Sequence, residues 1–366
     1  MERVTIREVA AMAGVAVSTV SAVLNDTGSA RVASATRARV LEAVDVLGYE
    51  PHHAARALRG KGSGSLVLID DDVSAGPYGG QMLAGVDDVC AQLGVRVVGL
   101  RTGGAADRER DALHYAGSLG ASGVVIASVS ETVRRLPGTV RAVLLNGRSP
   151  SDDVPGVVPD NFAGSADVVR ELVDYGHRRI GMVTIGPCEA ADRRLDAARQ
   201  VVAERWGRDA VTDDLVVRMS NVEATAGGGQ EAGRRLLNLP EPPTAVVCFN
   251  DRMAMGVYEA AAERGLHLPS DLSVVGFDNV EPIADSLDPG LTTVALPERE
   301  MGQLAAVLAL DPDGARDAAT AEVSYSANQL NRVGSTVRIA CPVIRRGSVG
   351  PPRARQHLMP TARAYP

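Results

Sequence analysis

The chain has 366 residues, 45% of them apolar, and a formal net charge of −7. Its length exceeds what one hydrophobic core usually supports, and no apolar run reaches the roughly 18 residues of a membrane span, so we expect two or more domains in a cytoplasmic protein without a signal segment. The charge is uneven: residues 1–61 hold eight basic and six acidic side chains, a net of +2, so the remaining 305 residues carry −9. A basic head on an acidic body favours contact between the head and phosphate.

The first fifty residues contain three short segments with the apolar spacing of helices. The first follows a capping box at Thr5–Glu8 and ends at Gly14, and the second covers residues 17–24. The third ends at Gly48. Two short helices joined by a tight glycine turn and braced by a third predict a helix-turn-helix domain over residues 1–50.

Residues 51–64 read as a short connecting segment. An alanine-rich stretch covers residues 53–59, and the glycine-rich run 60–65 predicts a flexible linker. The glycines of this run precede a strand instead of following one, which disfavours a phosphate-binding loop.

From residue 65 onward, short apolar strands alternate with helices such as 81–93 and 253–264. This alternation predicts doubly wound, mostly parallel sheets, and residues 65–349 are too many for one such sheet. We therefore expect two similar lobes with a ligand cleft between them, followed by a disordered tail at 350–366. The predicted strands are 66–69, 96–100, 124–127, 142–145, 180–185, 216–218, 245–249 and 273–277.

Several longer motifs carry a resemblance to a known family. They are Val4–Ala10, Ala13–Val15, Ser18–Asn25, Leu47–Pro51, Ala54–Arg59, Gly176–Gly181, Asn250–Gly256, Pro269–Asp278 and Leu291–Val294. With these motifs in this order, the chain resembles the lactose-repressor (LacI/GalR) family of bacterial transcription regulators along nearly its whole length. It departs from the family at Ala16, where a serine is usual, and matches poorly over 310–327.

The resemblance implies a small all-α helix-turn-helix domain and an α/β two-lobed, periplasmic-binding-protein-like domain. It also implies a ligand-responsive repressor that acts as a homodimer on a palindromic operator in double-stranded DNA. Besides DNA, its expected partner is a small-molecule effector, and a sugar is the expected class. No cofactor is implied. The four cysteines lie far apart without metal-site spacing, so we expect them to be buried filler and expect no metal.

The resemblance also implies which residues contact DNA. Val17, Ser18 and Ala22 stand where the family reads bases, although Val17 could instead belong to the helix core. The resemblance further implies a hinge helix at Ala54–Arg59, from which Leu58 would wedge into the minor groove with Arg59 beside it; the alternative is a helix packed on the body. Phosphate and positioning contacts are expected from Thr5, Thr19, Ser21, Asn25 and Arg31.

For the effector, the resemblance and the ends of the predicted strands point to Arg194, Asn250, Asp251 and Asp278 in one lobe. Weaker candidates from the other lobe are Tyr78, Asn146 and Asp160. Asp278 could instead cap a turn, and for Asp251 the cap of the following helix is the favoured alternative. Few aromatic residues favour a sugar over a purine base.

Other classes of function stay open at this point. A sugar-binding transport protein would share the two-lobed body but not the helix-turn-helix. An enzyme is disfavoured because the sequence contains no GxSxG, HExxH or GxxxxGK[ST] motif. A ligand-independent regulator and a corepressor-controlled repressor remain alternatives to induction by ligand.

Overall fold

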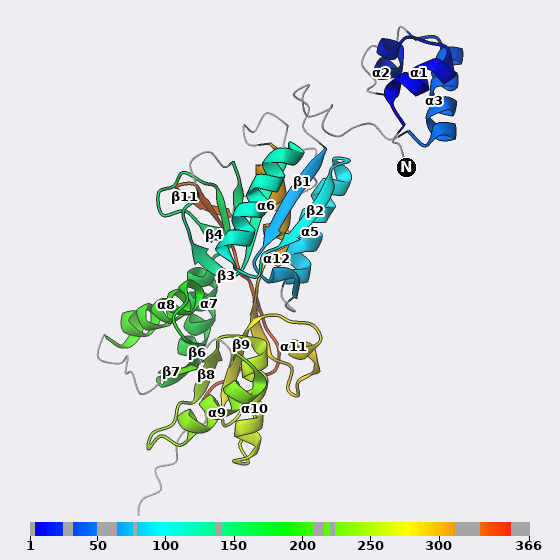
Figure 1. The fold of residues 1–366 in the computed structure, drawn as a ribbon. Coiled ribbons are helices and arrows are strands. Elements are labelled where there is room, and N and C mark those ends of the chain that lie inside the picture. Colours follow the sequence, from blue (N-terminus) through cyan, green and yellow to red (C-terminus); the bar gives the residue numbers. More distant parts are fainter. Residues whose placement is uncertain are drawn as a thin grey trace, which may run out of the picture. The chain divides into compact units, whose positions relative to one another are not determined.

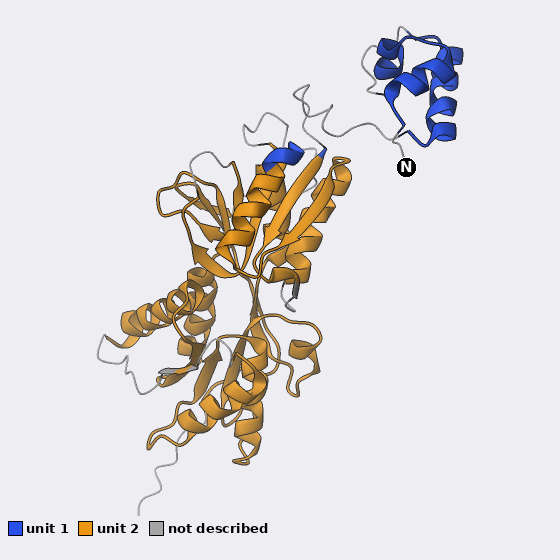
Figure 2. Cartoon of the chain, in the orientation of Figure 1, with its two compact units in different colours: residues 1–64, 117–122 blue, residues 65–116, 123–366 orange. Residues whose placement is uncertain are grey.

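The computed structural model describes residues 4–24, 32–49, 64–75, 79–136, 141–207, 216–219, 224–311 and 330–352. The chain divides into two compact units, residues 1–64 with 117–122, and residues 65–116 with 123–366 (Figure 2). The predicted hinge helix and most of the predicted tail lie outside the described residues. The same holds for five predicted site residues, Asn25, Arg31, Leu58, Arg59 and Tyr78.

The first unit contains the predicted helix-turn-helix. Its helices are α1 (Ile6–Ala13), α2 (Val17–Leu24) and α3 (Ser34–Leu47). At the start of α1, the Glu8 carboxylate accepts hydrogen bonds from the backbone N–H and the hydroxyl of Thr5, at 2.6 and 2.8 Å. Left-handed glycines end α1 and α3, with φ of 63° at Gly14 and 61° at Gly48, a conformation that costs glycine no steric strain.

The N-terminal lobe of the second unit is a seven-stranded sheet in the order β11-β12-β5-β4-β3-β1-β2, parallel except for the β11–β12 pair. Helices α5 and α12 pack together on one face, and α6 covers the other (Figure 1). Every residue of β1 is buried, as expected for a strand covered on both faces. The strands are β1 (Ser65–Asp70), β2 (Arg96–Arg101), β3 (Gly123–Val133), β4 (Val143–Arg148), β5 (Gly156–Pro159), β11 (Leu330–Val333) and β12 (Thr336–Ile339). The helices are η2 (Val73–Ala75), α5 (Gly79–Gln92), α6 (Ala106–Leu119) and α12 (Glu298–Leu310).

The C-terminal lobe is a six-stranded sheet in the order β13-β10-β9-β8-β6-β7, with only β13 antiparallel. Helices α7 and α8 pack together on one side of the sheet, and α9 and α10 pack together on the other. The strands are β6 (Ile180–Ile185), β7 (Val216–Met219), β8 (Ala245–Cys248), β9 (Ser273–Asp278), β10 (Thr292–Ala295) and β13 (Val343–Ile344). The helices are α7 (Asn161–Asp174), α8 (Glu189–Trp206), α9 (Ala226–Leu237), α10 (Asp251–Ala262) and α11 (Ile283–Ser286).

The chain passes between the lobes at three places: Asp160, residues 296–297 and residues 340–342. The first crossing follows β5 directly and the second follows β10 directly. The carboxyl ends of the parallel strands of both lobes therefore lie where the lobes meet, which is where open α/β sheets bind ligands. The two-lobed body predicted from the sequence is confirmed.

Glycines allow two of the helix pairs, α5 with α12 and α9 with α10, to pack closely. A Cβ atom on Gly85 of α5 would lie 2.0 Å from the Arg299 carbonyl oxygen of α12, and one on Gly302 would lie 2.0 Å from the Met82 carbonyl oxygen. The same arrangement joins α9 and α10 at Gly229. Backbones at these crossings leave no room for any side chain.

Candidate functional site

The amino-terminal end of α2 is exposed to solvent. Val20 and Val23 of this helix are buried in the three-helix core, whereas Val17 is 41% exposed. The alternative that Val17 is a core residue is therefore wrong. Ser18 beside it is exposed as well, so an apolar and a hydroxyl side chain point outward at the amino end of the second helix.

The remaining described DNA-contact candidates differ in exposure. Thr5 is exposed, and Thr19, Ser21 and Ala22 are half-buried. Thr5 also holds the start of α1 through Glu8, whose pKa is lowered by the hydrogen bond from the Thr5 backbone. These side chains are small, so they suit contacts in which the helix backbone approaches a phosphate closely.

Arg194 of α8 is buried, and its guanidinium is held by two hydrogen bonds and two aromatic rings. Its Nε donates to Asn161 Oδ1 at 2.9 Å and its Nη1 donates to the Phe249 carbonyl oxygen at 2.5 Å. The guanidinium also lies over two rings, with Cζ 3.4 Å from the Phe277 centroid and 4.7 Å from the Phe249 centroid. Stacking and charged hydrogen bonds together offset the cost of burying this cation.

Asp278 lies at the end of β9, close enough to Arg194 to interact with its charge. Burial raises the pKa of Asp278 well above its ordinary value, and Arg194 opposes that rise. The residue has a positive φ of 102°, which is uncommon outside glycine and marks a constrained turn. The carboxyl group of Asp278 and the guanidinium of Arg194 thus lie near each other at the carboxyl end of β9 in the C-terminal lobe.

Asn250 and Asp251 are tied down within the C-terminal lobe. Asn250 caps α10 by accepting a hydrogen bond from the Met253 backbone N–H at 2.8 Å. Asp251 is fully buried; its Oδ1 accepts from the Thr293 hydroxyl at 2.6 Å and its Oδ2 from the Val280 backbone N–H at 2.7 Å. The interpretation of Asp251 as the helix cap is wrong, since the preceding residue supplies the cap.

The two described candidates from the N-terminal side of the cleft also shape the backbone. Asn146 has φ of 58°, and its Nδ2 donates to the carbonyl oxygens of Ser128 and Val129 at 3.0 and 3.1 Å. Asp160 stands at the first crossing and caps α7 by accepting from the Ala163 backbone N–H at 3.1 Å. Asn146 thus joins β3 and β4, and Asp160 fixes the start of α7.

Sequence reasoning missed the residues that hold Arg194. Asn161 is 1% exposed and links Arg194 to Glu131, whose Oε2 accepts from Asn161 Nδ2 at 3.1 Å. Phe249 and Phe277 are two of the three phenylalanines in the chain, and both directly precede predicted site residues. Their position at strand ends was the available signal, but it does not reveal which side chain stacks on them.

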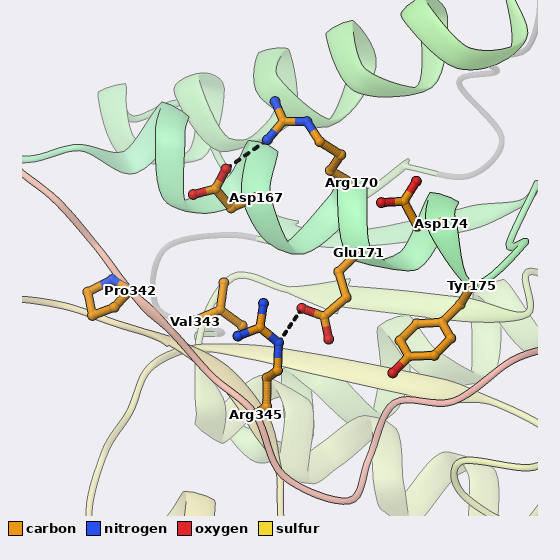
Figure 3. A pocket seen from close by; sticks show the side chains of 8 residues that line it. All are labelled: Asp167, Arg170, Glu171, Asp174, Tyr175, Pro342, Val343 and Arg345. Atoms are coloured by element: carbon orange, nitrogen blue, oxygen red, sulfur yellow. Dashed lines mark hydrogen bonds and ion pairs between the residues drawn. The ribbon is translucent and has the colours of Figure 1, made fainter.

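A groove of about 680 Å³ lies away from these residues, along α7 and residues 342–345. Figure 3 shows ion pairs along it, Arg170 with Asp167 at 2.7 Å and Arg345 with Glu171 at 2.8 Å. None of the predicted site residues lines this groove. Its charges are largely satisfied by one another.

Neither a metal site nor a single spanning helix is found in the part of the chain that the structure describes. No group of three or more His, Cys, Asp or Glu side chains there could hold a metal ion. No single described helix is long and apolar enough to cross a membrane; only the bent pair α1 and α2 passes, by length and composition alone.

Comparison with known proteins identifies the family. The model for "Bacterial regulatory proteins, lacI family" matches residues 5–52, and that for "Periplasmic binding protein-like domain" matches residues 169–349. The HTH-type transcriptional repressor CytR of Escherichia coli strain K12 is 32% identical over 315 residues, covering 84% of this chain and 89% of the relative. Catabolite control protein A of Priestia megaterium is 31% identical, covering 82% of this chain and 90% of the relative.

Solved structures agree on the fold. The Lac repressor dimer bound to operator and the anti-inducer ONPF superposes with a TM-score of 0.73 at 24% identity, covering 95% of this chain and all of that chain. A LacI-family regulator from Rhizobium etli is 26% identical, with a TM-score of 0.64, covering 78% of this chain and 99% of that chain. The chain belongs to the lacI family of bacterial regulatory proteins and is a ligand-responsive, DNA-binding transcriptional repressor.

Proposed function

We propose that this repressor is a cytoplasmic homodimer, not an enzyme, that binds a palindromic operator and is released from it by a sugar in the interlobe cleft. The observation that carries the effector part is the buried, stacked Arg194 beside Asp278 at the strand ends of the C-terminal lobe. A fixed donor fork next to a carboxyl group offers the donors and acceptors that sugar hydroxyls need.

The aromatic rings support a sugar over a purine base. A purine effector would be expected to stack on an aromatic face. The rings of Phe249 and Phe277 instead lie against the guanidinium of Arg194. Those ring faces are occupied by the protein itself, so polar groups dominate what a ligand can meet there.

The dimer follows from how little DNA one helix can read. Helix α2 has eight residues, and the exposed Val17 and Ser18 stand at its amino end. Such a helix reads only a few base pairs, and a two-fold protein doubles the site by reading an inverted repeat. Without a long arginine, glutamine or asparagine at these positions, base reading would rely on thymine methyl groups and one hydroxyl.

The site residues are proposed in the same roles as from the sequence. Bases would be read by Val17, Ser18 and Ala22, with Leu58 and Arg59 in the minor groove. Positioning on phosphates would come from Thr5, Thr19, Ser21, Asn25 and Arg31. The effector would lie among Tyr78, Asn146, Asp160, Arg194, Asn250 and Asp278, and the buried Asp251 would support this site through its bond to Val280.

Selection of binding sites from random DNA tests the first half of the proposal. A near-palindrome of under about 20 base pairs is expected, because two half-sites lie about one helical turn apart. A consensus without two-fold symmetry would contradict it.

Gel shifts on the selected site, with a panel of monosaccharides and disaccharides, test the second half. We expect at least one sugar to release the complex, and release by nucleobases alone would overturn the sugar assignment.

A further inference from the structure

Four charged side chains and one amide from the two lobes meet where α8 contacts β3. The N-terminal lobe supplies Glu131 on β3 and Arg148 on β4, and the C-terminal lobe supplies Asn161, Glu189 and Arg193 at the starts of α7 and α8. Helix α8 of the C-terminal lobe packs against β3 of the N-terminal lobe at this place. We call these five residues the interlobe cluster.

The ion pairs of the interlobe cluster cross from lobe to lobe in both directions. Arg148 Nη2 of the N-terminal lobe lies 2.9 Å from Glu189 Oε1 of the C-terminal lobe. In the opposite direction, Arg193 Nε lies 3.6 Å from Glu131 Oε1. Arg193 also donates to Glu189 at 3.0 and 2.8 Å, so the two pairs form one network. Each lobe therefore contributes one cation and one carboxylate.

Burial differs between the two pairs. The Glu131 side chain is only 2% exposed, and burial raises its pKa while Arg193 and Asn161 oppose that rise. Arg148 and Glu189 are 29% and 26% exposed, so their pairing costs less solvation. The attraction across the lobes is thus partly offset by the cost of enclosing Glu131. A ligand that binds two lobe arrangements with different affinity can shift the balance between them.

Asn161 connects this network to Arg194. Its Oδ1 accepts from Arg194 Nε at 2.9 Å, and its Nδ2 donates to Glu131 Oε2 across the lobes at 3.1 Å. At 1% exposure the amide has no freedom to exchange these partners for water. A shift of Arg194 would therefore move the Asn161 amide and change its hydrogen bond to Glu131 in the other lobe.

We propose that the interlobe cluster is an ionic clasp that holds the two lobes in the arrangement seen here, with Asn161 as the positioning residue that links the clasp to Arg194. The link to ligand rests on the effector binding at Arg194; the clasp itself does not. The clasp favours this arrangement of the lobes, and loss of the Arg148–Glu189 pair shifts the lobes apart.

The clasp is tested by measuring the distance between the lobes without any ligand. Spin labels on His114→Cys of α6 and Gln200→Cys of α8, in a Cys188→Ser background, report that distance by pulsed electron resonance. Labelled chains are diluted into unlabelled chains so that only pairs within one chain contribute. Both introduced sites are exposed, and the other three cysteines are buried.

Arg148→Ala and Glu189→Ala should each shift the distribution to longer distances. Because both remove the same cross pair, the double variant should resemble Glu189→Ala alone. Arg234→Ala is the matched control: it removes an Arg–Glu pair with Glu263 that lies within the C-terminal lobe, and should leave the distance unchanged. Unchanged distances in both clasp variants, with cooperative melting retained, would overturn the clasp.

The role of Asn161 is tested by exchanging donor and acceptor. Asn161→Asp keeps an oxygen for Arg194 but sets a carboxylate against Glu131, so the lobes should separate at pH 8. Adding Glu131→Gln returns a donor opposite the new carboxylate and should restore the shorter distance. If the double variant stays as open as Asn161→Asp, the link is wrong. Neither measurement involves a sugar, so the result stands apart from the fate of the effector assignment.

Discussion

The guanidinium carbon of Arg194 lies 3.4 Å from the centre of the Phe277 ring, so a buried cation sits on the aromatic side chain that directly precedes Asp278 in the chain. The ring fixes the plane of the guanidinium, and the backbone oxygen of Phe249 fixes its rotation. Both contacts are made by the protein itself. A ligand that bonds to Arg194 therefore loses little free energy in ordering its partner.

The first prediction concerns this pair. Arg194→Ala and Asp278→Ala should both abolish the response of operator binding to sugar, while operator binding without sugar is retained. The expected loss is the entire coupling free energy between sugar binding and operator binding, about 1–3 kcal/mol, or 5- to 150-fold in operator affinity. Gel-shift titrations with the active sugar measure it.

The control for that experiment is Arg170→Ala. Arg170 is an exposed arginine on α7 that pairs with Asp167 outside the cleft. Its removal should leave the sugar response intact. A response at wild-type sugar concentrations in either cleft variant would show that the effector binds elsewhere.

The second prediction concerns Leu58, which lies outside the described residues and rests on the sequence. Leu58→Gly should weaken specific operator binding by a few kcal/mol, roughly one unstacked base step, while non-specific binding changes little. Circular-permutation gel shifts should show a straighter operator. Full operator affinity together with full bending in this variant would rule out a wedge.

The third prediction is a pH dependence of stability from Glu298, the first residue of α12. Burial raises the pKa of Glu298 to about 7, against a value of 4.5 in the absence of burial. Because the folded state binds this proton more tightly, the contribution is present at low pH and is lost as pH rises from about 4.5 through 7. Between pH 8 and pH 6 it should amount to about 1 kcal/mol.

Glu298→Gln isolates this contribution, because the amide cannot ionise. Urea unfolding at pH 8 should find the variant more stable than the parent, and the gap should narrow at pH 6. Groups that do not interact with Glu298 titrate alike in both proteins and cancel in the difference. Parallel curves for the two proteins would show that Glu298 is ionised in the folded state throughout.

Most of the fold could be predicted because its signals are local. The eight predicted strands all occur, since runs such as Ile180–Ile185 are apolar and flanked by turn residues. The strand at 124–127 was predicted too short, because β3 continues through the mostly polar residues 128–132, with a register shift beside β4. Strands β5 and β10–β13 were missed: each is four residues or fewer, and several depend on partners far along the chain.

The candidate site was less predictable, for a physical reason. Arg194 and Asp278 follow from family motifs and strand ends, which are visible along the chain. Glu131 and Glu189 belong to different lobes, and their shared ion-pair network forms only where α8 packs against β3. Nothing in the sequence near either residue indicates that contact. Asp251 shows the limit of local reasoning, because its place before a helix suggests a cap while its real partners are Val280 and Thr293.

The last prediction concerns the contact between α5 and α12, the pair that covers one face of the N-terminal sheet. A Cβ atom on Gly85 would lie 2.0 Å from the Arg299 carbonyl oxygen and 2.9 Å from the Gln303 backbone nitrogen, so the obstruction is backbone that cannot rotate away. Gly85→Ala must therefore push the helices apart, and should destabilise the protein by about 1–3 kcal/mol, the usual cost of overpacking. Gly80→Ala in the same helix is the control, since nothing lies within 4 Å of its Cβ and alanine favours helix; it should be neutral or stabilising by up to about 1 kcal/mol. Urea unfolding of both variants measures the difference, and equal stability for the two would mean that the helices cross less closely than they do here.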